Sequence, residues 1–139
     1  RGPAGPAGRR CRSPRRVPRY GEERYEQRAS DTCETNGVAV ELSATVDLAG
    51  PIEGMERHQL RMRMVTTEPG GAFGPFHDHK GRPGTVYILQ GMITDHRDGV
   101  VTEYGPGLGW PEDRHTTHWL ENRETVPAVE VSVDIVRPE

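Results

Sequence analysis

The chain has 139 residues, of which 32% are hydrophobic and 28% are charged, and its formal net charge at pH 7 is −3. This length allows one domain of ordinary size, and the lack of any run of about 18 apolar residues excludes a membrane-spanning helix from the sequence. The small net charge hides an uneven distribution, since residues 1–20 contain seven arginines and no acidic residue.

The beginning of the chain is rich in arginine, proline and glycine and poor in apolar residues. We therefore predict a disordered arm over residues 1–34, followed by one folded domain over residues 35–139. The arm could bind nucleic acid by charge alone, but no aromatic residue is interleaved before Tyr20, so we expect no nucleic-acid partner. Cys11 and Cys33 are expected to be free thiols in a cytoplasmic protein, although a chain that begins at Arg1 leaves an exported form open.

Two segments with alternating apolar and polar residues open the folded part. Gly37–Leu48 and Leu60–Thr66 both follow the period of two that is typical of a strand with one buried face. In an enzyme, arginines in the second segment could clamp an anionic substrate, but we expect them to be solvated. The predicted orientation is Leu60, Met62 and Met64 inward, and Arg61 and Arg63 outward.

The rest of the chain predicts more strands joined by tight turns. Thr85–Gln90 is a short apolar strand, and Asp98-Gly99 between two further strands is a strong hairpin signal. The stretch from Gly105 to His118 is predicted to be a long loop. No helical period extends over a helix length, so we predict an all-β domain closed as a jelly roll. In its last strand, the residues expected to face inward are Val129, Val131, Val133 and Ile135, alternating with Glu130, Ser132 and Asp134.

A pair of histidines is the most informative local feature. His77 and His79 are separated by one residue, and side chains two positions apart on a strand project to the same face. Both imidazoles can therefore reach one point. Neutral imidazole is a good ligand for divalent transition metals, so this pair predicts a metal site.

The residues around this pair, together with a second group downstream, resemble the two motifs of the cupin superfamily. The matching residues are Gly71, His77, His79 and Gly91 in the first motif and Gly105, Pro111, His118 and Asn122 in the second. The resemblance covers about Leu60 to Val136. It implies a small single-domain cupin with a double-stranded β-helix, a jelly-roll barrel of two packed antiparallel sheets.

The chain departs from the cupin pattern at two places. Gly84 stands where the first motif has a glutamate, and the loop before His118 is two residues longer than in the family. His115, His96 or a carboxylate from elsewhere in the barrel could replace that glutamate. Asn122 is expected to fix the turn after His118 rather than to touch a ligand.

The resemblance implies that His77, His79 and His118 hold a divalent metal, which could be iron, zinc, manganese or nickel. A small polar molecule would bind beside it in the mouth of the barrel. No general base is evident, because Glu103, Glu112 and Glu121 could each face water.

Two alternatives remain open at this point. One is a metal-dependent dioxygenase or isomerase, and the other is a non-catalytic ligand-binding or sensing cupin without metal. Small cupins are often homodimers, in which case Val38 to Val46 would pack on a second subunit.

Overall fold

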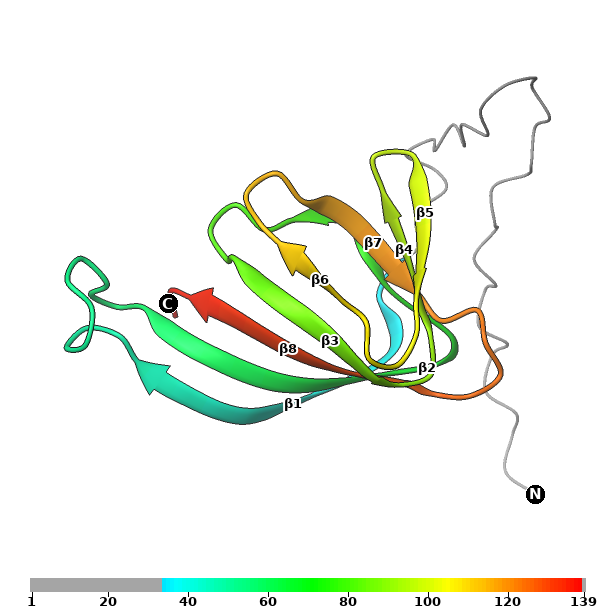
Figure 1. The fold of residues 1–139 in the computed structure, drawn as a ribbon, viewed down its shortest axis with the longest axis horizontal. Coiled ribbons are helices and arrows are strands. Elements are labelled where there is room, and N and C mark those ends of the chain that lie inside the picture. The colour runs from blue at the N-terminus through cyan, green and yellow to red at the C-terminus, as the bar shows by residue number, and fades with distance from the viewer. Residues whose placement is uncertain (1–33, 139) are drawn as a thin grey trace.

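The structure is a computed structural model that describes residues 34–138 (Figure 1). These residues form strands and no helix, which confirms the all-β prediction, and none of them belongs to a helix able to cross a membrane. The predicted arm apart from Glu34, together with Cys11 and Cys33, lies outside the described residues. The strands are β1 (Asn36–Asp47), β2 (Gln59–Asp78), β3 (Gly84–Gln90), β4 (Ile93–Arg97), β5 (Val100–Tyr104), β6 (Gly109–Glu112), β7 (Thr117–Glu121) and β8 (Ala128–Val136).

Strand β2 connects the two layers of the barrel, because its two halves pair with different neighbours. Its first half is antiparallel to β1 and β8, and its second half is antiparallel to β7. Around it the strand order is β5-β4-β7-β2-β8-β3-β6, with β1 added at β2. Figure 1 shows the result, with β1, β2, β8 and β3 in one curved layer and β7, β4 and β5 in the other. This is the jelly-roll arrangement predicted from the sequence.

The change of layer in β2 occurs at Gly70 and Gly71. Gly70 has φ = 77°, and a Cβ on Gly71 would lie 2.9–3.0 Å from three backbone carbonyl oxygens, so both positions favour glycine. Asn122 holds this bend, since its backbone N–H donates to Gly71 O and its side chain donates to Thr67 O, both at 2.9 Å. The first-motif glycine and the second-motif asparagine therefore meet. Asn122 also donates to Val126 O at 2.8 Å, which holds the turn after β7 as expected.

The predicted β4–β5 hairpin is present, and both Asp98 and Gly99 have positive φ, at 52° and 72°. The predicted loop from Gly105 to His118 is wrong in part, because β6 covers Gly109–Glu112 and β7 begins at Thr117. Pro111 made the segment look irregular, yet β6 pairs on one side only, with β3, where proline is tolerated. His118 consequently lies within a strand.

The predicted orientations of β2 and β8 are also wrong. Glu130, Ser132 and Asp134 are buried, whereas Leu60 and Met62 are exposed. Arg61 lies opposite Asp134 on the inner face, and Met62 lies opposite Val133 on the outer face. Alternation identifies the two faces of a strand but does not show which of them is buried. Here the interior near these strands is polar and ion-paired.

The apolar core occupies only part of the barrel. Ile88 on β3 is fully buried, whereas Gly84 at the start of the same strand lies opposite Asp134 in the polar part. The core therefore supports one side of the interior and leaves polar side chains around the other. Its buried residues are Val86, Ile88, Ile93, Trp110, Leu120 and Ala128.

Candidate metal centre

The three histidines singled out in the sequence come together inside the barrel. His77 on β2 and His118 on β7 are cross-strand partners, and His79 follows directly after the end of β2. The centroids of the three rings are 4.8–5.1 Å apart, and one ligand atom from each residue lies within 4.8 Å of the others. The bend in β2 and its pairing with β7 thus place the ligand atoms of two motifs at one point.

Each of these histidines has its Nδ1 atom next to an oxygen acceptor. His77 Nδ1 lies 3.2 Å from Pro75 O, His79 Nδ1 lies 2.8 Å from Glu112 Oε2, and His118 Nδ1 lies 3.1 Å from Asp95 Oδ1. A ring nitrogen that faces an acceptor carries the proton of a neutral imidazole. These contacts favour the tautomer with a lone pair on Nε2, although His79 Nδ1 makes no aligned hydrogen bond to Glu112 and Arg97 Nη2 also lies 3.2 Å from His118 Nδ1. In metal-binding proteins, a contact of this kind fixes the orientation and the tautomer of the histidine ring.

The distance between the ring nitrogens fits a bound ion. His79 Nε2 and His118 Nε2 are 3.1 Å apart, and two facing lone pairs at that distance repel each other. Two nitrogens that each bind one ion at about 2.1 Å are about 3.0–3.4 Å apart, and the ion replaces the repulsion by attraction. Burial, followed by the charge of His118, lowers the pKa of His77 to about 4, so this ring is neutral at pH 7. The donor set therefore fits a divalent metal.

Glu112 supplies a carboxylate close to where the family has its glutamate. It lies on β6 directly opposite Gly84 on β3 and contacts the site through His79. Burial raises the pKa of Glu112, but hydrogen bonding and charge from His79 outweigh burial and lower this pKa to about 2. Trp110 Nε1 donates to its other oxygen at 3.1 Å. Glu112 is thus buried and ionised rather than facing water, and it reaches the centre through a histidine.

Asp95 on β4 contacts Nδ1 of His118, as Glu112 contacts Nδ1 of His79. Both residues are fully buried, and Asp95 Oδ2 accepts a hydrogen bond of 2.9 Å from Arg97 Nη2, which also lies 3.2 Å from His118 Nδ1. The guanidinium therefore holds the carboxylate against the ring. Two ionisable carboxyl groups, Asp95 and Glu112, lie next to the three imidazoles and can offset the charge of a divalent ion.

The two histidines considered as replacements for the missing glutamate do not reach the centre. His115 is exposed and accepts from Arg114 Nε at 3.3 Å. His96 is fully buried, stacks on Trp119 with ring centroids 3.9 Å apart, and has Nε2 3.1 Å from Glu121 Oε1. Of the glutamates that could face water, Glu121 is buried and Glu103 is exposed.

Sequence reasoning missed the roles of Asp95 and Glu112. Trp110 and Glu112 are two positions apart and share one face of a strand. The position of Glu112 opposite Gly84, however, depends on the pairing of β3 with β6. Asp95 lies in a strand that was predicted, and its contact with His118 depends on the pairing of β4 with β7. Neither pairing is encoded in a local pattern.

A small cavity of about 30 Å³ adjoins the histidines and is lined in part by His77, His79, Glu112 and Glu130. This volume accommodates one ion or one or two water molecules. Burial and the charge of Glu112 raise the pKa of Glu130 to about 8. At neutral pH, the cavity is thus bordered by one ionised and one protonated carboxyl group.

Comparisons with solved structures support the same fold at low sequence identity. KdgF from a Halomonas species has a TM-score of 0.59 at 18% identity, covering 74% of this chain and 82% of that one. The Cupin_2 domain of an XRE family transcriptional regulator from Enterobacter cloacae has a TM-score of 0.54 at 17% identity, covering 75% and 100% of the two chains.

A cupin-superfamily sugar phosphate isomerase from Silicibacter pomeroyi has a TM-score of 0.52 at 18% identity, covering 72% and 73% of the two chains. A search of curated proteins finds no match. At these identities the structures establish the fold alone. A model of the cupin domain matches residues 63–134, which include both histidine motifs. Since this match spans more than half of the sequence, the chain belongs to the cupin domain family.

Proposed function

We propose that this cupin binds a divalent metal ion through His77, His79 and His118 and binds a small polar molecule beside it. The observation that carries the proposal is that the three imidazoles each offer one ligand atom within 4.8 Å of the others, with each Nδ1 beside an oxygen acceptor. A bound divalent ion would act as a Lewis acid toward an oxygen of the ligand. A metal-dependent dioxygenase or isomerase would use the same three side chains, and we propose neither reaction.

The chain's own residues determine how such a site behaves. Glu112 and Asp95 lie beside Nδ1 of His79 and His118, and carboxylates in this position favour the tautomer that offers Nε2 to a metal. Arg97 holds Asp95 in place. These contacts orient the rings in advance, which lowers the entropic cost of binding an ion.

Elemental analysis of the purified full chain tests the metal site. After loading with one divalent metal and desalting, the wild type should retain close to one ion per chain, whereas His118→Ala should retain less than about a tenth of that, since a two-histidine site is incomplete. Absence of metal from the wild type even after reconstitution would overturn the proposal. It would favour a ligand-binding or sensing cupin without metal.

The outer contact provides a finer test of the same site. Glu112→Gln should weaken metal affinity by about 10–100-fold, because outer-shell carboxylates contribute effects of that size. Glu121→Gln is the matched control, since it also removes a buried carboxylate that contacts a histidine, but one outside the cluster. Competition with a chelator would measure both affinities. Equal losses in the two variants would show that the effect is general destabilisation.

We also propose that two copies of the chain form a homodimer through the outer face of the sheet. Cross-strand partners place apolar side chains on one face of four adjoining strands. Four of them are substantially exposed, namely Val46 (50%), Leu60 (37%), Met62 (39%) and Tyr87 (50%). Contiguous apolar surface of this kind is typical of an interface, and a two-fold axis allows the face to pair with itself.

Sedimentation velocity tests the homodimer. The wild type should sediment with twice the mass of the chain, and Met62→Lys should shift the population to monomer because it places a charge in the interface. Val126→Lys is the control, since Val126 is an exposed apolar residue in the β7–β8 loop. A monomeric wild type at micromolar concentration would contradict the dimer.

A further inference from the structure

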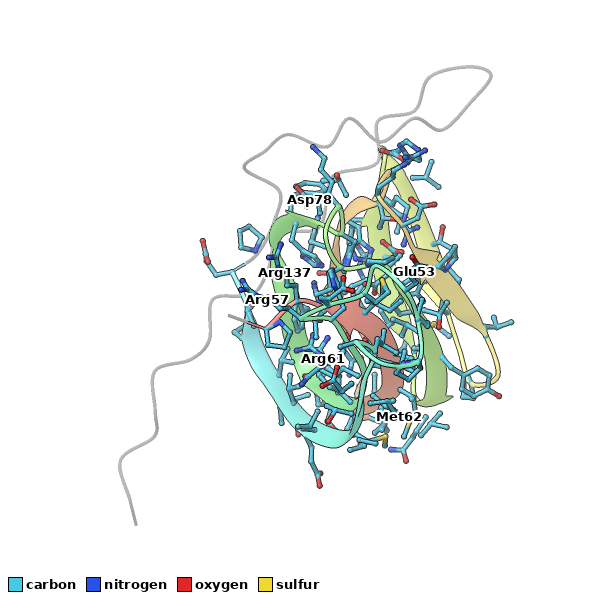
Figure 2. The ribbon with its side chains drawn as sticks, turned by 90° about the vertical axis from the view of Figure 1, so that its left-hand side faces the viewer. Glu53, Arg57, Arg61, Met62, Asp78 and Arg137 are labelled. Carbon is cyan, nitrogen blue, oxygen red and sulfur yellow. The ribbon has the colours of Figure 1, made fainter. Side chains whose placement is uncertain are left out.

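A second, larger hollow lies beside the histidine cavity at the open end of the barrel. Its volume is about 660 Å³, and its lining includes Arg61, Arg63, Arg82 and Arg137 together with the apolar residues Val40 and Leu42 of β1. None of the described residues that line it is acidic. Figure 2 shows Arg61 and Arg137 close together within the curve of the sheet, while Met62 lies at its lower edge.

The arginines of this groove outnumber the carboxylates that accept hydrogen bonds from them. Asp134 accepts from Arg61 at 2.9 and 2.8 Å, from Arg63 at 3.4 Å and from Arg82 at 3.2 Å. One carboxylate thus serves three guanidinium groups, and Arg137 adds a fourth at the rim. An excess of guanidinium groups with free donors favours the binding of an anion.

Arg63 gives independent support for a missing anionic partner. Its Nε is buried and has no hydrogen-bond partner among the described residues. Burial, followed by the charge of Arg61, lowers the pKa of Arg63, and the charges of Asp134 and Glu112 only partly oppose this. Buried donors normally have partners, so a ligand oxygen is a natural one for this N–H.

The groove and the histidine cavity share lining residues. Arg63 and Arg82 line both of them, and His77 and His79 line the cavity. The cavity, at about 30 Å³, is too small for an organic molecule, whereas the groove, at about 660 Å³, lies in the range of small-molecule sites. An organic ligand must therefore occupy the groove and can present only one polar end to the histidines.

We propose that the groove binds a small organic anion, whose carboxylate or phosphate group is held by Arg63 and Arg82 while its other polar end faces the three histidines. This inference rests on the proposed function, because it names the class of molecule bound beside the metal. Val40 and Leu42 would contact the carbon skeleton of the ligand. The amino-terminal segment of the chain is a poor occupant, since residues 1–20 contain seven arginines and no acidic residue and are repelled by the same charge.

Isothermal titration of the full chain at low ionic strength tests the anion subsite with three probes. Glycerol 3-phosphate and malonate carry the two candidate groups, and neutral glycerol is the uncharged control. Saturable binding of at least one anion, without binding of glycerol, is expected, and the tighter of the two anions identifies the preferred group. Lack of saturable binding of both anions to metal-loaded and chelator-treated protein overturns the proposal.

Arg82→Gln should weaken binding of the preferred anion about tenfold, the size of effect expected when one charge-assisted hydrogen bond is lost. Arg114→Gln is the matched control, because it removes the same charge from an exposed residue outside the groove. Equal affinities in these two variants overturn the proposal. If circular dichroism shows that Arg82→Gln does not fold, Arg137→Gln, an exposed residue near the chain end, decides by the same criterion.

The same titrations separate this inference from the metal proposal. Arg82-dependent binding to chelator-treated protein, in a chain that retains no metal, would uphold the subsite and reject the metal. If the wild type retains metal that His118→Ala loses, and Arg82→Gln binds the anion as tightly as the wild type does, the metal site is upheld and the anion subsite is rejected.

Discussion

Replacing Glu130 with glutamine should stabilise the metal-free protein by on the order of 3 kcal/mol at pH 7. Glu130 lies on the inner face of β8, where burial and the charge of Glu112 raise its pKa to about 8, and Arg63 lowers it only in part. At pH 7 the unfolded chain ionises this carboxyl group, whereas the folded chain keeps it protonated. Folding therefore carries the cost of binding a proton, and a neutral amide of similar shape removes that cost.

The contribution of Glu130 to the free energy of unfolding falls as pH rises. A carboxyl group whose pKa is raised on folding contributes stability that is fully present below its unfolded value of about 4.5 and is lost as pH rises through about 8. His77, whose pKa is lowered, acts in the opposite sense between about pH 4 and 6.5. The relevant quantity is thus the difference between variant and wild type, which should grow from pH 4.5 to pH 8.

Urea unfolding of chelator-treated protein at several pH values measures this difference. Glu103→Gln is the matched control, since Glu103 is exposed on β5 and the same change removes a solvated carboxylate. A difference that is absent for Glu130→Gln would show that Glu130 is ionised in the folded protein. A difference that is equally large for Glu103→Gln would show that the effect does not come from the burial of Glu130.

Restoring the family's glutamate at Gly84 should destabilise the fold by about 3 kcal/mol or more and should not strengthen metal binding. A Cβ at this position would lie 2.5 Å from Val133 O and 2.8 Å from Asp134 Cβ. Because a backbone oxygen is one of these atoms, β3 would have to move away from β8, which disturbs the pairing that holds Asp134 and Glu112 near the site. The carboxylate already reaches the centre from Glu112, on the strand opposite.

Urea unfolding and metal titration of Gly84→Glu measure both parts of this prediction. Gly84→Ala should lose much of the same stability, because the clash involves only the Cβ. Gly81→Ala is the control, since nothing lies within 4 Å of a Cβ at Gly81 and its φ is not positive. A stable Gly84→Glu variant with tighter metal binding would mean that the strand accommodates a direct carboxylate ligand.

The three histidines were predictable for two separate reasons. His77 and His79 share a face because strand side chains alternate, and this follows from the local sequence alone. His118 required the spacing of the second cupin motif, and the structure places it directly opposite His77 in the β2–β7 pairing. Residues that belong to local periodicities or to a family motif are therefore predictable from the sequence.

The orientation of the strands was not predictable in the same way. Alternation in β2 and β8 correctly separates Leu60 and Met62 from Arg61 and Arg63, but it carries no information about which set faces inward. The wrong choice followed from assuming an apolar interior, and it made the groove arginines look like solvated residues. Their ion pairs become evident only when Asp134 is seen to lie opposite Arg61.

By itself, the sequence determined the all-β class, the strand periods, the Asp98-Gly99 turn and the histidine pair, because each depends on residues within one strand or one turn. Tertiary structure alone decided that Glu112 lies opposite Gly84, that Asp95 supports His118 and that Arg63 and Arg82 line the same two hollows. These contacts join strands that are distant in the chain. Their register is set by packing of the whole barrel, and no local pattern in one sequence specifies which of these distant strands will pair.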